Sequence, residues 1–174
     1  MDIRILQATI SDISAMVDLS YLKRRNYEKA QSKFWRYQEG AEYAQSEWFQ
    51  QLLMDINYIM LIAKSGEEII GFIIGKIMPA PMVYDPGGLT LMIDDFCVKE
   101  DKWSEIGTPL IEKIKKISKE KGARQLVVVS GDHDIDKCRF LDQAGLSVAS
   151  RWYVGEIDSD PPVKRFGEKL EEEL

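Results

Sequence analysis

The sequence predicts a single α/β domain with a mixed, mostly antiparallel β-sheet and helices on both faces of that sheet. Three observations predict this class. Apolar segments with strand character follow one another through the middle of the chain. A strand, an amphipathic helix and another strand then alternate, which is typical of a parallel crossover. The chain has 174 residues, 45% of them hydrophobic and 30% charged, which fits one folded domain with a sizeable core.

The first half of the chain predicts a strand, two helices and a β-hairpin. Residues Ile3–Gln7 alternate apolar and polar side chains, as a half-buried strand does. A helix is expected to start at Ser11, and a second one lies in the aromatic-rich stretch 27–55. The apolar segments Tyr58–Ala63 and Ile69–Met78 flank Ser-Gly-Glu-Glu, which predicts two strands joined by a tight turn.

The second half predicts three strands that alternate with two helices. A long loop rich in proline and glycine precedes the first of these strands. The expected elements are a strand over Leu89–Val98, a helix over Pro109–Glu120, a strand over Gln125–Ser130, a helix over Ile135–Ala144 and a strand over Ser147–Ile157. The first two of these strands should be parallel neighbours. The domain is expected to span residues 1–157, with a charged tail over residues 158–174.

The charge of the chain argues against nonspecific nucleic-acid binding. It holds 29 acidic and 23 basic residues, for a net charge of −6, whereas binding to phosphates needs a basic face. The one basic run, Lys23-Arg24-Arg25, is expected to end the first helix, where positive charge suits the helix dipole.

Membrane insertion and metal binding are also disfavoured. No apolar run approaches the roughly 18 residues that a membrane helix needs, and the N-terminus lacks the pattern of a signal peptide. We therefore expect a cytoplasmic protein without a membrane partner. The cysteines Cys97 and Cys138 and the single histidine, His133, show no metal-ligand spacing, so we expect no metal.

The chemistry is expected where the strand Leu89–Val98 leads into the following helix. Thr108 precedes Pro109, and this pair predicts a helix start with Thr108 as its N-cap. The unpaired amides of a helix start bind anions, and Gly107 would let a phosphate approach the backbone closely. This segment therefore predicts a pocket for a pyrophosphate-bearing cofactor.

With this strand–loop–helix segment, the order of elements over residues 3–157 resembles the GNAT superfamily of acyl-CoA-dependent N-acetyltransferases. The central motif of that family is Arg/Gln-x-x-Gly-x-Gly/Ala, and the aligned residues here read Lys-Trp-Ser-Glu-Ile-Gly. Lys102 keeps a cation at the first position and Gly107 keeps the final glycine, whereas Glu105 replaces a glycine.

A second aligned region begins at Asp134 and ends at Gly145-Leu146. The family commonly has a tyrosine here that protonates the departing thiolate, and Leu141 stands at that position. The family general acid is therefore missing from this chain.

The resemblance implies acetyl-CoA as co-substrate and direct transfer of its acetyl group to an amine of a small molecule or a protein. The tetrahedral intermediate would be stabilised by strand amides near residues 96–98. The residues expected to contact acetyl-CoA are Phe96, Cys97, Val98, Lys102, Trp103, Ser104, Glu105, Ile106, Gly107 and Thr108.

Asp94 and Asp95 are candidates for the general base, because carboxylates are costly on an otherwise apolar strand. Adjacent residues face opposite sides of a strand, so at most one of the two should face the acceptor. The alternative is that one pairs with a lysine and the other caps a loop.

Other side chains are weaker candidates for proton transfer. His133 lies at the C-terminal end of a strand, where active sites of open sheets gather. Tyr153, Tyr84 and Trp152 either line the acceptor pocket, with tyrosine as a substitute acid, or simply pack at its rim. Cys97 is expected to be a buried core thiol, because no basic partner lies near it in sequence.

The nature of the acceptor is only weakly indicated. The aromatic-rich stretch falls where GNAT proteins bind acceptors, and Glu39, Glu42 and Glu47 within it favour a cationic amine such as a polyamine, an aminoglycoside or a peptide amine. The alternative for this stretch is helix packing with a surface for a homodimer. Two further readings remain open: a domain that binds acyl-CoA or a partner without catalysis, and a purely structural module whose cleft is filled by side chains.

Overall fold

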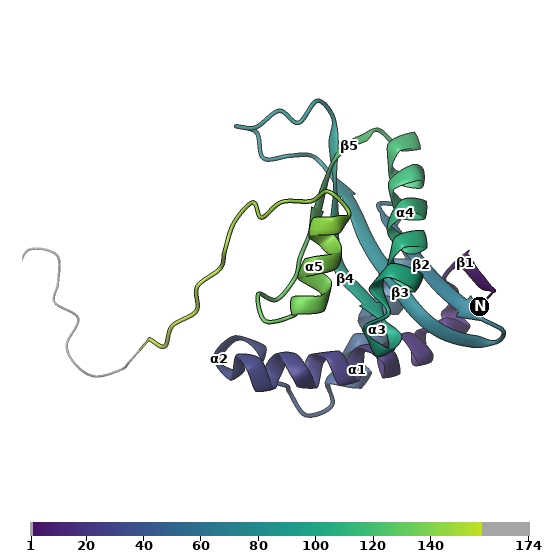
Figure 1. Ribbon diagram of the computed structural model, residues 1–174, viewed down its shortest axis with the longest axis vertical. Coiled ribbons are helices and arrows are strands. Elements are labelled where there is room, and N and C mark those ends of the chain that lie inside the picture. The colour runs from purple at the N-terminus through teal and green to yellow at the C-terminus, as the bar shows by residue number, and fades with distance from the viewer. Residues whose placement is uncertain (1, 158–174) are drawn as a thin grey trace, which may run out of the picture.

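A computed structural model of the protein describes residues 2–157, which contain a five-stranded sheet with helices on both faces (Figure 1). The strands follow one another across the sheet in chain order. They are β1 (Ile3–Gln7), β2 (Tyr58–Ser65), β3 (Glu68–Met78), β4 (Leu89–Val98) and β5 (Ala123–Val128). The helices are α1 (Ile13–Ala30), α2 (Ser32–Trp35), α3 (Ala41–Met54), α4 (Thr108–Glu120) and α5 (Ile135–Gln143).

The pairing of the strands confirms the predicted mixed, mostly antiparallel sheet. The first four strands pair antiparallel, and β4 pairs parallel with β5. The expected parallel neighbours are thus side by side, with α4 between them in the chain. The β2–β3 hairpin turns at Gly66, whose φ of +61° is a left-handed conformation that glycine adopts without strain.

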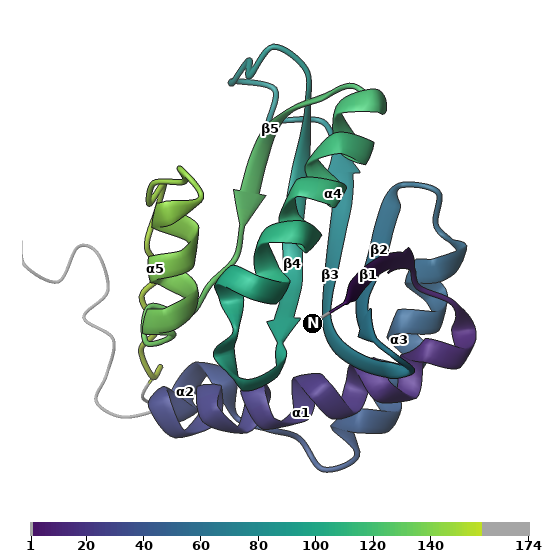
Figure 2. The ribbon, with the colours of Figure 1, turned by 45° about the vertical axis from the view of Figure 1, so that its right-hand side comes forward.

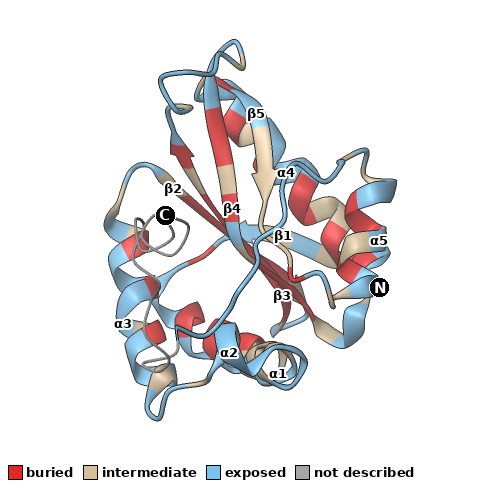
Figure 3. Ribbon diagram, turned by 90° about the vertical axis from the view of Figure 1, so that its left-hand side faces the viewer, coloured by how far each residue is buried: buried red, intermediate tan, exposed pale blue. Residues whose placement is uncertain are grey.

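Each face of the sheet carries its own core. On one face, α4 packs across the middle strands (Figure 2), with Leu110 and Ile114 fully buried. On the other face, α1 and α3 pack through Met16 and Phe49 against Phe72 of β3. Figure 3 shows these buried residues concentrated on the strands and on the inner faces of the helices. Burial of this apolar surface is the main stabilising contribution to the fold.

A β-bulge in β4 interrupts the sheet near its centre. Ile74 lies opposite Asp95 and Gly75 lies opposite Ile93, which leaves Asp94 as the extra residue. The parallel pairing with β5 ends at the same level, where the Val129 N–H donates to the Ile93 carbonyl at 2.9 Å. Beyond this point the two strands diverge, and the β5 side of β4 has no further strand partner among residues 2–157.

The expected strand over Ser147–Ile157 is wrong. These residues pair with no strand, and the Trp152 and Tyr153 side chains are 80% and 90% exposed. Alternation of side chains shows only that a segment is compatible with a strand, and whether the segment pairs depends on tertiary contacts that alternation does not encode. Here Trp152 contacts Phe34 instead, with ring centroids 6.2 Å apart. The predicted tail over residues 158–174 lies outside the described residues.

The start of α4 also differs from the prediction. A π-helical turn over Trp103–Gly107 leads directly into α4, and Thr108 has helical angles of φ −57° and ψ −54°. Its N–H donates to the Trp103 carbonyl, so Thr108 is not an N-cap. A residue before proline usually avoids helical backbone angles, but Thr108 adopts them because the preceding turn is already helical. The unpaired amides of this helix start are therefore those of Trp103, Ser104 and Glu105.

Candidate active site

Two cavities flank the diverging ends of β4 and β5 in the described part of the chain. The loop cavity, of about 290 Å³, lies between the Trp103–Gly107 turn and α5. The bulge cavity, of about 550 Å³, lies between β4 and the helices α1, α2 and α3. The loop cavity is lined by Asp101, Lys102, Trp103, Ser104, Glu105, Asp136, Arg139, Phe140 and Gln143. The bulge cavity is lined mainly by Lys23, Arg24, Tyr27, Phe34, Trp35, Arg36, Tyr37, Trp48, Asp94, Asp95, Phe96, Cys97, Val129, Ser130, Gly131 and Lys137.

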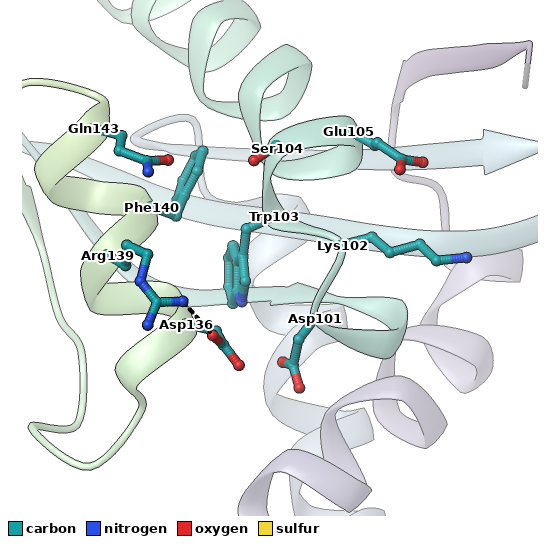
Figure 4. A pocket seen from close by; sticks show the side chains of 9 residues that line it. All are labelled: Asp101, Lys102, Trp103, Ser104, Glu105, Asp136, Arg139, Phe140 and Gln143. Carbon is teal, nitrogen blue, oxygen red and sulfur yellow. Dashed lines mark hydrogen bonds and ion pairs between the residues drawn. The ribbon is translucent and has the colours of Figure 1, made fainter.

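The loop cavity offers several donors to an anionic ligand. Its wall includes the turn whose first amides have no helical acceptor, and the Arg139 side chain faces it from α5 (Figure 4). The Trp103 Nε1–H is buried and has no acceptor among the described residues. In Figure 4 the Lys102 and Glu105 side chains both point away from α5, so the Glu105 carboxylate does not face the centre of the cavity. These donors fit the phosphate end of a coenzyme A thioester.

Carboxylates on the rim of the loop cavity oppose anion binding. Asp136 accepts a hydrogen bond from Arg139 at 3.1 Å, and Asp101 lies across from it (Figure 4). An anion in this cavity would therefore depend more on the backbone amides of the turn than on the net charge of the lining side chains.

Gly107 is required for packing rather than for close approach of a phosphate. It has an ordinary helical φ of −67° and does not line the loop cavity. A Cβ at this position would lie 3.1 Å from the Trp103 ring and 3.2 Å from the Phe140 ring. The absence of a side chain at Gly107 thus lets these two rings stack, with centroids 5.5 Å apart.

Trp103 separates the two cavities together with two lysines. Its side chain is 3% exposed and lies edge-on to Phe96, at 5.0 Å between centroids. The Lys23 and Lys137 Nζ atoms lie 4.5 and 5.8 Å from the Trp103 ring on the side of the bulge cavity. Trp103 lines the loop cavity and the two lysines line the bulge cavity, so a layer formed by these three side chains lies between the cavities. A ligand that spans both cavities passes through this layer.

The bulge cavity combines aromatic walls with charged groups. Tyr27, Phe34, Trp35, Tyr37 and Trp48 line it from the helical side. The aromatic-rich stretch thus forms the wall of a cavity as well as helix packing. The acidic side chains that led us to expect a cationic acceptor are exposed and do not line this cavity; they are Glu39, Glu42 and Glu47. These three residues are therefore not part of the site.

Both aspartates of β4 line the bulge cavity, although only one was expected to do so. The bulge breaks the alternation of side chains, and this places Asp94 and Asp95 on the same cavity. Arg24 of α1 donates to both Asp95 oxygens, at 3.3 and 3.2 Å. Burial raises the pKa of the Asp95 carboxyl, and the Arg24 guanidinium opposes that rise. Asp94 is exposed and has no ion-pair or hydrogen-bond partner among residues 2–157.

The basic run of α1 belongs to this site rather than to a helix end. The helix continues to Ala30, and Lys23 and Arg24 lie within it and line the cavity. The Lys23 Nζ lies 2.7 Å from Asp134, which also accepts a hydrogen bond from the Tyr27 hydroxyl at 2.9 Å. Burial opposes ionisation of Asp134, but Lys23 and the Tyr27 hydroxyl hold its pKa below the usual value.

Lys137 is a buried cation at the point where β4 and β5 diverge. Its side chain is 2% exposed, and Nζ donates to the Val129 carbonyl at 2.9 Å. The Nζ atom lies 5.9 Å from the Phe96 ring. Burial lowers the pKa of the Lys137 ammonium to about 8, and repulsion from Lys23 adds to this effect.

We expect the buried charge of Lys137 to reduce the stability of the fold at neutral pH. Because the folded-state pKa lies below that of the unfolded chain, stability should rise between about pH 8 and pH 10.5. A shift of this size corresponds to about 3 kcal/mol. The Lys137→Met variant should therefore unfold at higher urea concentration than the parent at pH 7, with the difference shrinking towards pH 10. An equal or lower midpoint for Lys137→Met at pH 7 would contradict this.

The other predicted site residues lie in different places. His133 packs edge-on against Tyr27, with centroids 4.4 Å apart, and does not line the bulge cavity. Tyr84 and Tyr153 are exposed and line neither cavity. Burial raises the pKa of the Cys97 thiol to about 11, which fits the predicted inert core thiol. Ile106 is buried in the core beneath the turn.

The prediction missed the burial of Trp103 and of Lys137. An aromatic residue in a loop gives no local signal of burial, because its packing depends on Phe96 and Phe140 from other elements. The sequence did carry a signal for the burial of Lys137. This residue lies three residues before Phe140 and four before Leu141, both buried, so it shares their face of the helix.

Two negative findings apply to the described residues. Within residues 2–157, no group of three or more His, Cys, Asp and Glu side chains is placed to hold a metal ion. No helix in this range is both long and apolar enough to cross a bilayer.

The described part of the chain is thus an α/β domain whose fourth and fifth strands diverge between the Trp103–Gly107 turn and the bulge cavity. The Acetyltransferase (GNAT) family matches residues 22–146, and the chain therefore belongs to this family. A search of curated proteins found no match to the sequence.

Solved structures show the same fold. A tetramutant of the BH1408 protein from Bacillus halodurans is 20% identical with a TM-score of 0.76, covering 90% of this chain and 100% of that one. A ribosomal-protein-alanine N-acetyltransferase from Brucella melitensis is 18% identical with a TM-score of 0.62, covering 90% and 100%. A predicted acetyltransferase with acetyl-CoA from Clostridium acetobutylicum is 15% identical with a TM-score of 0.68, covering 89% and 96%. At these identities the likeness shows the fold alone.

Proposed function

We propose that the protein transfers an acetyl group from acetyl-CoA to a primary amine bound in the bulge cavity. The observation that carries this proposal is the free Asp94 carboxylate at the β4 bulge, which lines a cavity large enough for a small acceptor. A carboxylate at this point can remove the proton that the amine loses on attack. The cytoplasm stays the expected location of the protein.

The acyl donor is expected to enter from the loop cavity. Its pyrophosphate would bind the amides of Trp103, Ser104 and Glu105, with the Arg139 side chain alongside. Its thioester would then reach the β5 side of β4, where the residues beyond Ile93, paired with β3 on their other side, have no strand partner within residues 2–157. The acetyl-CoA-containing structure from Clostridium acetobutylicum supports this choice of donor.

The charges around the bulge cavity favour an acceptor with one amine and an apolar body. The charged side chains that line it are the cations Lys23, Arg24, Arg36 and Lys137 and the anions Asp94 and Asp95. Cations outnumber anions, so a polyamine or an aminoglycoside would be repelled. The five aromatic side chains of the wall suit a flat apolar group instead.

Titration calorimetry of the full chain with acetyl-CoA tests donor binding. We expect one site per chain, with the same affinity in an Asp94→Asn variant, because Asp94 lies on the other cavity. No heat and no thermal shift with acetyl-CoA would show that the chain does not use this donor.

Glu105 stands where the family motif has a glycine, and this difference gives a further prediction. Because the Glu105 side chain is exposed and points away from α5, Glu105→Gly should bind acetyl-CoA with equal affinity or up to about fivefold tighter. Glu105→Gln removes the charge alone, and Glu112→Gln removes the same charge from an exposed position on α4. A marked loss of affinity in Glu105→Gly and Glu105→Gln, but not in Glu112→Gln, would show that the carboxylate takes part in binding.

A second candidate function is a domain that binds acyl-CoA or a protein partner without catalysis. The layer formed by Trp103, Lys23 and Lys137 between the cavities favours it, as does Leu141 at the position of the family tyrosine. Stoichiometric binding of acetyl-CoA without thiol release, over a panel of amines, would support this function against the first.

A further inference from the structure

We propose that Lys137 is the general acid that protonates the departing thiolate. This inference rests on the proposed function and assigns a role that Leu141 cannot fill. Lys137 lies four residues before Leu141 on α5, hence about one turn away on the same face.

The position of Lys137 follows from the two cavities. The acceptor amine lies near Asp94 in the bulge cavity, and the phosphate end of the donor lies in the loop cavity. The sulfur of the thioester therefore lies between them, at the layer formed by Trp103 and Lys137. The Lys137 Nζ is held in this gap by the Val129 carbonyl, between the diverging ends of β4 and β5.

The chemistry balances with groups present in the site. The acceptor ammonium first gives one proton to solvent, and as the C–N bond forms the nitrogen loses a second proton to Asp94, which passes it to water before the next turnover. As the C–S bond breaks, its electron pair goes to sulfur, and a proton passes from the Lys137 Nζ to that sulfur. Lys137 is left as a neutral amine and regains a proton from water before the next turnover. A buried amine is well suited to this role, since burial makes it more ready to give up its proton.

The ionisation of Lys137 is set by groups on three sides. Lys23 approaches from α1, Asp95 and Cys97 from β4, and Asp134 from the start of α5. Lys23 destabilises the ammonium, whereas the two carboxylates stabilise it. Replacing Lys23 should therefore raise the pKa of Lys137.

The kinetic test compares Lys137→Met with the parent and with Lys113→Met, which removes a lysine from the exposed face of α4. We expect kcat of Lys137→Met to fall about 100-fold or more, with the KM for acetyl-CoA within about threefold of the parent. The parent kcat should decline above about pH 8, as the acid loses its proton. This basic limb should be absent from Lys137→Met and shifted to higher pH in Lys23→Met.

A binding test needs no turnover. If the Lys137 Nζ faces the sulfur, the parent should bind coenzyme A about tenfold tighter than desulfo-coenzyme A at pH 8, because the sulfur gains a hydrogen-bonding partner that desulfo-coenzyme A cannot use. Lys137→Met should bind both ligands equally. Urea unfolding of each variant shows whether it is folded, and Lys137→Met is expected to be the more stable protein.

Each contrary outcome identifies what fails. An unchanged kcat and pH profile in Lys137→Met, with transfer by the parent intact, would overturn the role of Lys137 and leave the proposed function standing. An acetyl group found on Lys137 by mass spectrometry would make it a nucleophile and overturn the acid role. Equal binding of the two ligands by the parent would place the sulfur elsewhere, and no transfer by the parent would overturn both proposals.

Discussion

Replacing Asp94 with asparagine should lower the rate of acetyl transfer by about 10²–10⁴-fold, the usual worth of a general base. Asparagine keeps the shape of the side chain but cannot take a proton from the amine. Since Asp94 has no partner among residues 2–157, its loss should leave stability nearly unchanged. Initial rates of coenzyme A release, with acetyl-CoA affinity measured alongside, check this expectation.

Asp95→Asn is the matched control for this variant. It lies next in the chain and lines the same cavity, but its carboxylate is held by Arg24. Asparagine keeps an oxygen acceptor for Arg24, and burial already disfavours the Asp95 charge, so we expect the stability to change by less than about 1 kcal/mol. Comparable small effects of both variants on turnover would remove both aspartates from the mechanism. A chain of waters would then be left as the base, because His133 does not line the cavity.

Replacing Gly107 with glutamate should abolish measurable binding of acetyl-CoA. Even a Cβ there meets the stacked rings of Trp103 and Phe140 at 3.1 and 3.2 Å. A whole carboxylate side chain displaces this stack, which forms part of the loop cavity, and adds negative charge beside the phosphates. Calorimetric titration should show a loss of more than about 100-fold in affinity.

Gly107→Ala separates the two causes of this loss of affinity, which are the displacement of the stacked rings and the added negative charge. It adds only the Cβ, so the rings need to shift by a few tenths of an ångström, and affinity should fall far less than in Gly107→Glu. Circular dichroism and urea unfolding show whether each variant is folded. A folded Gly107→Glu protein that binds acetyl-CoA normally would place the donor outside the loop cavity.

The sequence predicted the sheet well because its strands carry strong local patterns. The bounds of Ile3–Gln7 and Leu89–Val98 match the structure, and the strand expected over Gln125–Ser130, observed as Ala123–Val128, pairs parallel with β4 as predicted. The pattern over Ser147–Ile157 is of the same kind but forms no strand, although β5 lies at the edge of the sheet, because pairing depends on tertiary contacts that local sequence does not encode.

The candidate site was predicted only in part. The segment with Asp94, Asp95 and Gly107 was identified from residue types on one strand and its following turn. The bulge that brings both aspartates into one cavity depends on the register with β3, which no local pattern reveals. The roles of Lys23 and Lys137 also depend on contacts between distant elements, α1 and α5, which meet only in the folded chain.

The most direct test of the central claim is a turnover measurement with the full chain. Parent protein and acetyl-CoA are mixed with a panel of amines that includes arylalkyl amines, a polyamine, an aminoglycoside and peptides with free N-termini. Thiol release is followed together with the mass of each amine. The account predicts that at least one singly charged amine with an apolar body is acetylated, with release of one coenzyme A per acetyl group transferred. Both the acetylation and the release should be lost in Asp94→Asn. Acetyl-CoA binding with no acetylated amine and no thiol release across the panel would contradict it and leave the non-catalytic binder.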